Sequence, residues 1–223
     1  MKPLLLAATL LATALAPAAA FADSPQHLVD SATLALEDLL DAPGGQQAGD
    51  VLRRARAVVI CPNIFRAGFV FGGEGGGCVM VARGAGGGWS DPAFYSLGSG
   101  SFGFQIGVQS AEVLMMIMTS TGLNAVLNSQ VKLGGDAGLT VATLGAGVNG
   151  SMSAGLTADI LTVSKSQGLY GGLTISGSIF AQNAGAQQAY YGTDLNSRQI
   201  IIDMAAHNPG ANPLRAELAR YGG

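Results

Sequence analysis

The sequence predicts an α+β protein with a single β-rich domain, in which antiparallel, glycine-rich strands form a curved or barrel-like sheet between N-terminal and C-terminal helices. Apolar residues alternate with Gly, Ser, Thr and Gln through the middle of the chain, which is the period of half-buried strands. Helical apolar periods are confined mainly to the two ends. With 223 residues, 48% hydrophobic and 11% charged, the chain can form one substantial core and is not expected to be disordered.

The first 22 residues have the pattern of a secretory signal peptide. Lys2 precedes the apolar run Leu4–Leu15, and Ala20-Phe21-Ala22 forms an A-x-A cleavage site. A transmembrane anchor fits less well because the run is short and Pro17 follows it. The residue directly after the cleavage site is Asp23 and not cysteine, so we do not expect a lipoprotein. The expected location is the periplasm or the periphery of the cell envelope.

The next segment, residues 23–56, is expected to contain two helices. Ser24-Pro25 is a helix start with an N-cap serine and proline in the first turn. One apolar stripe follows, and the helix should end at Pro43-Gly44. Its members are Leu28, Ala32, Leu36, Leu39 and Leu40. A second helix over Gln46–Arg56 should lead into a buried strand at Ala57–Ile60.

The β-rich domain is expected over residues 57–192, with glycine turns at 72–77 and 84–88. Its clearest strand signal is at residues 102–109, where Phe102, Phe104, Ile106 and Val108 alternate with glycine and glutamine. The first set should face the core. The opposite strip, Gly103, Gln105 and Gly107, leaves backbone open to a close neighbour. The run Val113–Met118 should be a strand buried on both faces.

Further elements follow from the same periodicities. A short helix is expected at Thr121–Asn128. From Val131 to Val141 the apolar residues occupy odd-numbered positions, which predicts a strand with one face buried. Asn149-Gly150 predicts a hairpin, and Leu169–Ile179 alternates as another strand. The expected helices near the C-terminus, most of them within residues 193–223, are Ala184–Tyr191, Ser197–Ala206 and Pro213–Tyr221.

The charge distribution argues against nucleic-acid binding but suggests a local basic patch. The chain has a net charge of −3, and without Lys2 it has 10 basic residues against 14 acidic ones. The arginines nevertheless concentrate in one segment, at Arg53, Arg54, Arg56, Arg66 and Arg83. They form either a basic patch or a set of separately solvated side chains.

Cys61 and Cys78 are the only two cysteines. In an exported protein they are permitted to form a disulfide, which would close a loop of about 17 residues and contribute roughly 3 kcal/mol. Two buried free thiols are the equal alternative. Neither cysteine has a neighbour at metal-ligand spacing, so no metal site is expected.

The sequence gives little support for an enzyme or a cofactor. The two histidines, His27 and His207, lie in segments expected to be helices near the ends of the chain, which does not favour a triad. Asp159 is expected to be a carboxylate bonded to loop amides in preference to a functional acid. The two G-x-G-x-x-G matches run into strand patterns, unlike a dinucleotide-binding turn.

Four segments together resemble the SYLF lipid-binding domain family. They are ARAVVICPNIFRAGFVFGGEGGG, WSDPAFYSLGSGSFGFQIGVQ, VKLGGDAG, and ADILTVSKSQGLYGGLTISGSIF followed by AYYG. The resemblance covers roughly residues 50–192. It implies a β-rich domain with flanking helices that binds phospholipid, and the family's eukaryotic members add phosphoinositide and actin-linked roles. Those members use basic N-terminal features, whereas the first helix here is acidic.

The resemblance and the charges together predict a non-enzymatic phospholipid-binding protein of the bacterial cell envelope. Anionic headgroups are the expected ligand, because a guanidinium can grip phosphate through two hydrogen bonds. The expected contacts are Arg53, Arg54, Arg56 and Arg66. The alternative is a structural or scaffolding protein that pairs with another chain, of unknown identity, through the strip Gly103, Gln105 and Gly107.

Overall fold

The computed structural model describes residues 24–43, 45–68, 71–102, 107–128, 130–133, 139–144, 158–168 and 177–222. Within these ranges eight strands form one sheet, in the order β5-β8-β3-β2-β1-β4-β7-β6. The strands are β1 (Ala57–Gly68), β2 (Phe71–Ala82), β3 (Ala93–Phe102), β4 (Gly107–Ile117), β5 (Gln130–Lys132), β6 (Val141–Thr143), β7 (Ile160–Gly168) and β8 (Ile179–Gln182). The predicted α+β class is confirmed, although the β6–β7 pair is parallel and the sheet is therefore mixed.

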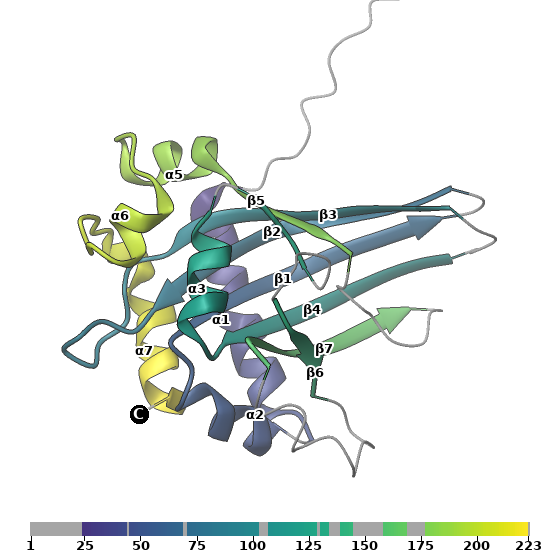
Figure 1. The fold of residues 1–223 in the computed structure, drawn as a ribbon, viewed down its shortest axis with the longest axis horizontal. Coiled ribbons are helices and arrows are strands. Elements are labelled where there is room, and N and C mark those ends of the chain that lie inside the picture. Colours follow the sequence, from purple (N-terminus) through teal and green to yellow (C-terminus); the bar gives the residue numbers. More distant parts are fainter. Residues whose placement is uncertain are drawn as a thin grey trace, which may run out of the picture.

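Helices cover both faces of this sheet (Figure 1). They are α1 (Pro25–Asp41), α2 (Gly45–Leu52), α3 (Ser120–Leu127), α5 (Ala184–Tyr191), α6 (Ser197–Ile201), the 3-10 turn η1 (Pro209–Ala211) and α7 (Asn212–Gly222). The sheet curls, so that the edge strands β5 and β6 lie on the same side as α3 while α1 crosses the opposite face. We call the side with α3 the inner face and the side with α1 the outer face.

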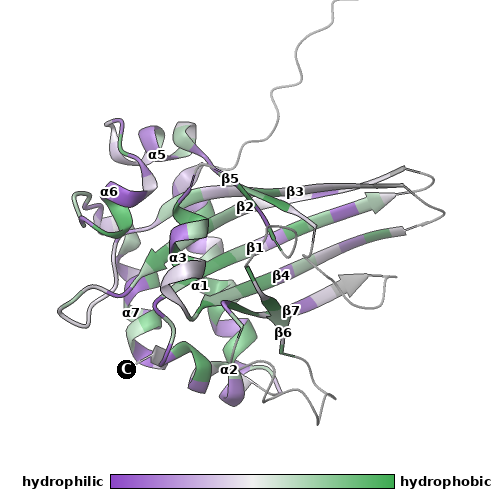
Figure 2. Cartoon of the chain, viewed as in Figure 1, coloured by the Kyte–Doolittle hydropathy of each residue, from purple (hydrophilic) through white to green (hydrophobic). Residues whose placement is uncertain are grey.

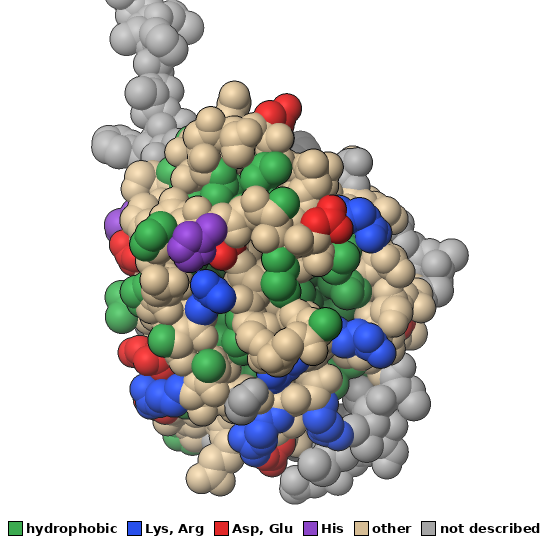
Figure 3. Space-filling model, turned by 90° about the vertical axis from the view of Figure 1, so that its left-hand side faces the viewer, with side chains coloured by type: hydrophobic (Ala, Val, Ile, Leu, Met, Phe, Trp, Pro, Cys, Tyr) green, Lys and Arg blue, Asp and Glu red, His purple; other side chains and the backbone are tan. Residues whose placement is uncertain are grey.

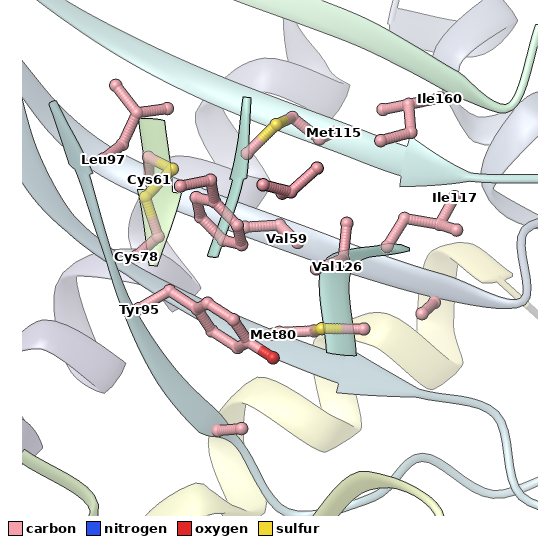
Figure 4. Close-up of a cluster of buried hydrophobic side chains, with 14 of the residues drawn as sticks. Val59, Cys61, Cys78, Met80, Tyr95, Leu97, Met115, Ile117, Val126 and Ile160 are labelled. Atoms are coloured by element: carbon pink, nitrogen blue, oxygen red, sulfur yellow. A yellow bond between two sulfur atoms is a disulfide. The ribbon is translucent and has the colours of Figure 1, made fainter. Parts of the chain in front are cut away.

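Each face has its own hydrophobic core. The inner core joins Val59, Met115 and Ile117 of the central strands to Val126 of α3 and to residues beside both sheet edges (Figure 4). The outer core packs Val58, Ile60, Leu114 and Met116 against α1, α2 and α7. Successive residues of β1 and β4 are therefore buried alternately inward and outward, which confirms the predicted doubly buried strand for Val113–Ile117, whereas Met118, the last residue of the predicted run, lies just beyond β4.

The N-terminal helix begins as predicted, with the Ser24 side chain accepting a hydrogen bond from the His27 amide. The second helix is shorter than predicted and ends at Leu52 instead of Arg56. Arg83 explains this end, because its guanidinium donates to the carbonyls of Leu52 and Ala55 at 3.3 and 3.1 Å. The Arg56 amide, which would continue the helix by bonding to the Leu52 carbonyl, bonds to Ile117 instead, and the Leu52 carbonyl accepts from the Ala55 amide and from Arg83.

The glycine run 72–77 was expected to be a turn, and this prediction is wrong. The run continues β2 and pairs with β1 on one side and β3 on the other. A Cβ atom at Gly76 would lie 2.2 Å from the Asn63 carbonyl oxygen and 2.8 Å from Ile64 Cδ1. Glycine is required there because β1 bulges toward β2 between Ile60 and Phe65.

Two predicted strands are divided in the structure. The strand expected over 102–109 is instead the end of β3 and the start of β4, which are not neighbours in the sheet. Val131 and Val141, expected in one strand, lie in β5 and β6 at opposite edges of the sheet. The Asn149-Gly150 hairpin and most of the predicted strand Leu169–Ile179 lie outside the described residues.

The helices after β8 follow the sequence prediction with one difference. Ala184–Tyr191 is helical as predicted, and α7 includes the whole of Pro213–Tyr221. The helix predicted to reach Ala206 ends at Ile201, and Met204 adopts a φ of 50°, which is incompatible with continuing a right-handed helix. No helix among the described residues is long and apolar enough to cross a membrane.

Candidate functional site

Three of the four predicted lipid-binding arginines, Arg53, Arg54 and Arg56, lie together in the link between α2 and β1, and all three are exposed. The backbone of this link is held firmly, because the Arg56 amide donates to the Ile117 carbonyl at 2.8 Å and the Arg56 carbonyl accepts from Arg83 at 2.9 Å. We call these three residues the arginine link. Figure 3 shows Lys and Arg side chains gathered at the lower part of this end of the molecule.

The arginine link has few acidic neighbours. Arg53 forms an ion pair with Asp50, whose side chain is 64% exposed, and also donates to the Tyr221 carbonyl at 3.4 Å. Within the described residues, Arg54 donates a side-chain hydrogen bond only to the Asp50 backbone carbonyl, at 3.3 Å. Such exposed ion pairs contribute little free energy and exchange readily for other anions. The link is therefore a cationic surface available to an anionic ligand.

Arg83, which belongs to the same stretch of arginines, has a structural role. Its guanidinium stacks over Trp89 at 4.4 Å and donates to the Gly222 carbonyl at 2.8 Å, in addition to its contacts at the end of α2. Burial lowers its pKa from the usual value. Arg83 thus joins β2, α2 and the end of α7.

Arg66 does not belong to this surface, which corrects the prediction that the four arginines act together. It lies ten residues beyond Arg56 along β1, which corresponds to about 30 Å of strand. Its side chain is on the inner face and forms an ion pair with Glu74 of β2. The sequence did not indicate this pair, because Glu74 was expected at the tip of a loop.

Arg66 is part of a polar row that crosses four neighbouring strands. In register, Ser99 of β3 faces Glu74, Glu74 faces Arg66, and Arg66 faces Gln109 of β4. We call these four residues the polar row. In Figure 2 the hydrophobic colouring of β1 is interrupted by a hydrophilic band toward its arrowhead. The row lies beyond the point where the inner core ends at Leu97 and Ala111.

Glu74 is the centre of the polar row. One carboxylate oxygen accepts from Arg66, and the other accepts from the hydroxyls of Ser99 at 2.9 Å and Ser178 at 2.7 Å. Glu74 is 9% exposed, so these donors replace the water that a charged carboxylate requires. Gln109 is 1% exposed, and within the part of the chain that the structure describes neither its amide oxygen nor its amide nitrogen has a hydrogen-bond partner.

The structure joins Cys61 and Cys78 in a disulfide, with Cα atoms 4.2 Å apart. The bond links β1 to β2 within the inner core, where it lies between Leu97 and Val59 in Figure 4. It is a structural link at the start of the β1 bulge, which follows Ile60, and it lies apart from the arginine link.

The glycine strip has a different structure from the one expected. Gly103 and Gln105 lie outside the described residues, and Gly107 begins β4 and pairs with Gly68 of β1. Val108, expected in the core, is 54% exposed, whereas Gln109 on the opposite parity is buried. The expected assignment of faces is therefore reversed in β4, since the parity of Gln109 continues through Val113 into the inner core.

Asp159 is a buried aspartate outside the strands that joins the segments around Thr119 and Thr140. Asp159 accepts hydrogen bonds from the Thr119 hydroxyl and from the amide and hydroxyl of Thr140 at 3.0 and 2.9 Å. These bonds, with that from Thr119 the strongest, hold the pKa of Asp159 below its usual value. Asp159 thus has the structural role that the sequence favoured.

Asp91, which sequence reasoning missed, anchors the C-terminal segment. It accepts from the Asn208 amide at 2.9 Å and lies 3.8 Å from a guanidinium nitrogen of Arg215. The Tyr191 hydroxyl donates to the neighbouring Pro92 carbonyl at 2.6 Å. In the sequence this contact corresponds to the WSDP segment, residues 89–92, whose polar groups hold the C-terminal helices against the sheet. Within the described residues, no group of three His, Cys, Asp or Glu side chains is placed to hold a metal ion.

Comparison of the sequence with known proteins points to one family. The model of a family named Ysc84, described as "Las17-binding protein actin regulator", matches residues 98–221. LAS seventeen-binding protein 3 of Saccharomyces cerevisiae (strain ATCC 204508 / S288c) is 30% identical over 168 residues, covering 74% of this chain and 36% of the relative. The human SH3 domain-containing YSC84-like protein 1 is 26% identical over 153 residues, covering 68% of this chain and 44% of the relative. The chain thus spans less than half the length of these relatives.

Proposed function

The chain belongs to the Ysc84 (SYLF) family, and from this premise we propose that it is a non-enzymatic protein that binds anionic phospholipid surfaces through Arg53, Arg54 and Arg56. The observation that carries the proposal is the arginine link, in which three exposed guanidinium groups lie within four residues on a backbone fixed to β2 and β4. Each guanidinium near an anionic membrane surface contributes about 1 kcal/mol of attraction.

The charge of the rest of the molecule favours docking by this end. The net charge is −3, so an anionic surface repels the molecule on average and attracts it only locally. Arg66 is excluded from the contact, because it is already paired with Glu74 on the inner face. The proposed contact is therefore smaller than the four residues expected from the sequence.

We further propose that the protein works at the periphery of the bacterial cell envelope, on the periplasmic side. Two features support this location. Residues 1–22 have a signal-peptide pattern, and a disulfide such as Cys61–Cys78 persists in oxidising compartments. Fractionation of cells tests it, since the mature protein should be recovered with the periplasm or released from membranes by salt.

Vesicle co-sedimentation tests the lipid proposal. The chain without residues 1–22 should pellet with vesicles of phosphatidylcholine and phosphatidylglycerol and stay in solution with phosphatidylcholine alone. Arg54→Ala/Arg56→Ala should lose most of this binding. A matched control is Lys132→Ala/Arg198→Ala, which removes the same charge from β5 and α6. Equal loss of binding in the control would show that only net charge matters, and unchanged binding in the first variant would reject the proposal.

A protein partner is the second candidate, and the names of the relatives favour it, since LAS seventeen-binding protein 3 is named for binding a protein. On this chain the outer face of the sheet offers Phe65 and Val108, which are 50% and 54% exposed and lie diagonally across β1 and β4. Exposed apolar side chains in a group are typical of protein contacts. If a partner binds there, Phe65→Ser/Val108→Ser should abolish its co-purification and leave vesicle binding unchanged.

A further inference from the structure

Met204, three residues after α6, has a backbone conformation that its own side chain disfavours. Its φ is 50°, and it is the one residue other than glycine with a positive φ in the part of the chain that the structure describes. The Ala205 amide donates to the Gln199 carbonyl at 3.0 Å and closes the turn, at a place after a helix where glycine is usual. A side chain kept in a strained position of this kind calls for a functional explanation.

The Met204 side chain contacts the loop between β2 and β3. A Cβ atom at Gly84 would lie 2.4 Å from Met204 Cε, so the methyl group occupies the space that a side chain at position 84 would take. The preceding residue, Arg83, donates its amide to the Arg56 carbonyl at 2.9 Å. These two contacts connect Met204 to the arginine link. In Figure 1 the β2–β3 loop and the turn after α6 both lie at the left, where β1 begins.

This end of the molecule exposes apolar side chains as well as arginines. Ile202 and Met204 are each 42% exposed. The tip of the β2–β3 loop, residues 85–88, is exposed and consists of one alanine and three glycines, and a Cβ atom on any of these glycines would meet nothing within 4 Å. Figure 3 looks onto this end and shows hydrophobic side chains above the basic ones. The small loop tip therefore lets a flat surface approach the arginines and the apolar pair together.

Basic and apolar side chains at one end match the chemistry of an anionic lipid bilayer. The headgroups attract guanidinium groups, and the boundary with the acyl chains just below them accepts apolar side chains. Exposed apolar residues that occur singly have no such meaning, but this pair is close to the arginine link. Asp203 lies between the two apolar residues and is exposed, so its charge opposes deep entry into an anionic surface.

We propose that Ile202 and Met204 enter the headgroup boundary of the bilayer when the arginine link binds an anionic surface. This inference rests on the proposed phospholipid function and adds an apolar anchor to the electrostatic contact. The left-handed turn at Met204 and the contact with Gly84 hold the anchor beside the arginines. Salt screens the attraction of the arginines but not the burial of apolar area, so the two parts of the contact differ in salt dependence.

Vesicle co-sedimentation at several salt concentrations tests the anchor. Ile202→Ser/Met204→Asn should bind vesicles of phosphatidylcholine and phosphatidylglycerol about tenfold more weakly than the wild type, because apolar area drives this part of the binding. The factor should be the same at every salt concentration. Leu34→Ser/Ile179→Ser, which changes two exposed apolar residues of α1 and β8, should bind as the wild type does. Equal binding by Ile202→Ser/Met204→Asn and the wild type would overturn the proposal.

The anchor variant should remain folded, which makes its loss of binding interpretable. Asparagine tolerates the left-handed conformation, and both replaced side chains are exposed, so the melting temperature should stay close to that of the wild type. A marked decrease would show that the pair supports the fold, and it would contradict an anchor that is free to leave the protein surface.

A fluorescent probe measures insertion itself. Ile202→Cys can be labelled selectively with an environment-sensitive dye, because Cys61 and Cys78 are joined in a buried disulfide. When vesicles bind, the emission should shift to shorter wavelength, and lipids with brominated acyl chains should quench it. The same label on Leu34→Cys should show neither change. Vesicles that pellet the protein without a change at position 202 would reject the anchor alone, whereas a wild type that pellets with no vesicle would reject the lipid function and the anchor together.

Asp203→Asn gives a prediction of opposite sign. Removing this charge should strengthen binding to the anionic vesicles about threefold at low salt, because a charge close to an anionic surface changes the binding free energy measurably. The gain should disappear at high salt, in contrast to the effect of the anchor variant. Unchanged binding at low salt would place residues 202–204 away from the bilayer and overturn the proposal.

Discussion

The two ends of β1 carry the same residue type in opposite settings. At its start, Arg56 and the preceding Arg54 extend into solvent, and the acidic group nearby, Asp50, is itself exposed. Near its end, Arg66 lies on the inner face and pairs with Glu74, which is 9% exposed. An exposed guanidinium contributes little to the fold and is available to ligands, whereas a paired and largely buried one is fixed by the cost of leaving its partner unpaired.

This difference shows that an arginine's role depends on strand register and not on its distance along the chain. Glu74 faces Arg66 because β1 and β2 form an antiparallel pair, and the ion pair would be lost if that register moved by one residue. The arginines therefore fall into two sets, one available for binding and one that stabilises the fold.

Arg66→Ala should destabilise the fold by about 3 kcal/mol, because it leaves the Glu74 carboxylate buried without its charged donor. Urea denaturation measures the change. Arg66→Ala/Glu74→Gln should recover much of the loss, since no unpaired charge remains. A change below about 1 kcal/mol in Arg66→Ala would place Arg66 with the exposed arginines, which do not support the fold.

Loss of the disulfide should have a similar or slightly smaller effect. Cys61→Ala/Cys78→Ala removes a link that closes a separation of 17 residues, which corresponds to about 3 kcal/mol. The disulfide joins the same two strands as the Arg66–Glu74 pair, so the two variants show how much of the stability of the β1–β2 pairing comes from the covalent link and how much from the ion pair. If reduction with dithiothreitol left the unfolding midpoint unchanged, the link would not be a stabilising one.

A third charged cluster should make stability depend on pH. Glu112 of β4 faces Lys165 of β7, and Lys165 pairs with Asp38 of α1. Burial, together with a hydrogen bond that protonated Glu112 donates to Asp38 and the negative charge of Asp38, raises the pKa of Glu112 from 4.5 to about 7. The folded state therefore holds this proton more tightly than the unfolded state, and the stabilisation is complete below about pH 4.5 and is lost as the pH rises through about 7.

The melting temperature of the wild type should accordingly decrease between pH 5 and pH 8 relative to that of Glu112→Gln, which keeps the shape of the protonated group without the titration. The same partners lower the pKa of Asp38, with the hydrogen bond donated by Lys165 as the main cause, so any contribution of Asp38 to stability changes only at more acidic pH. Parallel pH profiles for the two proteins would rule out the titration of Glu112 in this range.

The smallest stability effect is expected at the arginine link. Arg54→Ala/Arg56→Ala should change the free energy of unfolding by less than about 0.5 kcal/mol, because both side chains are exposed. Differential scanning calorimetry measures this difference. A loss comparable to that of Arg66→Ala would show that the link also supports the fold, and any loss of vesicle binding could then be indirect.

Local signals in the sequence were sufficient for the helices and for the most buried strand. Ser24 and Pro25 fixed the start of α1, and the unbroken apolar run at Val113 fixed the centre of β4. The glycine run around Gly76 could not be interpreted, because the need for glycine arises from Asn63 of the neighbouring strand. Nothing within a short window reveals a contact of that kind.

The candidate site was predictable only in part for the same reason. The arginine link follows from the end of a helix, whereas the partners of Arg66 depend on pairing between strands. Alternation correctly separated Val108 from Gln109 but could not tell which of them faces a core, because helices or edge strands cover both faces of the sheet. A period of two residues shows that neighbouring residues lie on opposite faces of a strand, but it does not show which face packs against a core.

The salt dependence of vesicle binding tests the division of the arginines most directly. The partition coefficient of the wild type for vesicles containing phosphatidylglycerol should fall steeply as salt rises, because exposed charges are screened. Arg54→Lys/Arg56→Lys should keep most of this salt dependence, whereas Arg54→Ala/Arg56→Ala should bind about 30-fold more weakly at low salt, from about 1 kcal/mol per arginine. Binding by the alanine variant that equals the wild type at low salt, with the same salt dependence, would contradict the account.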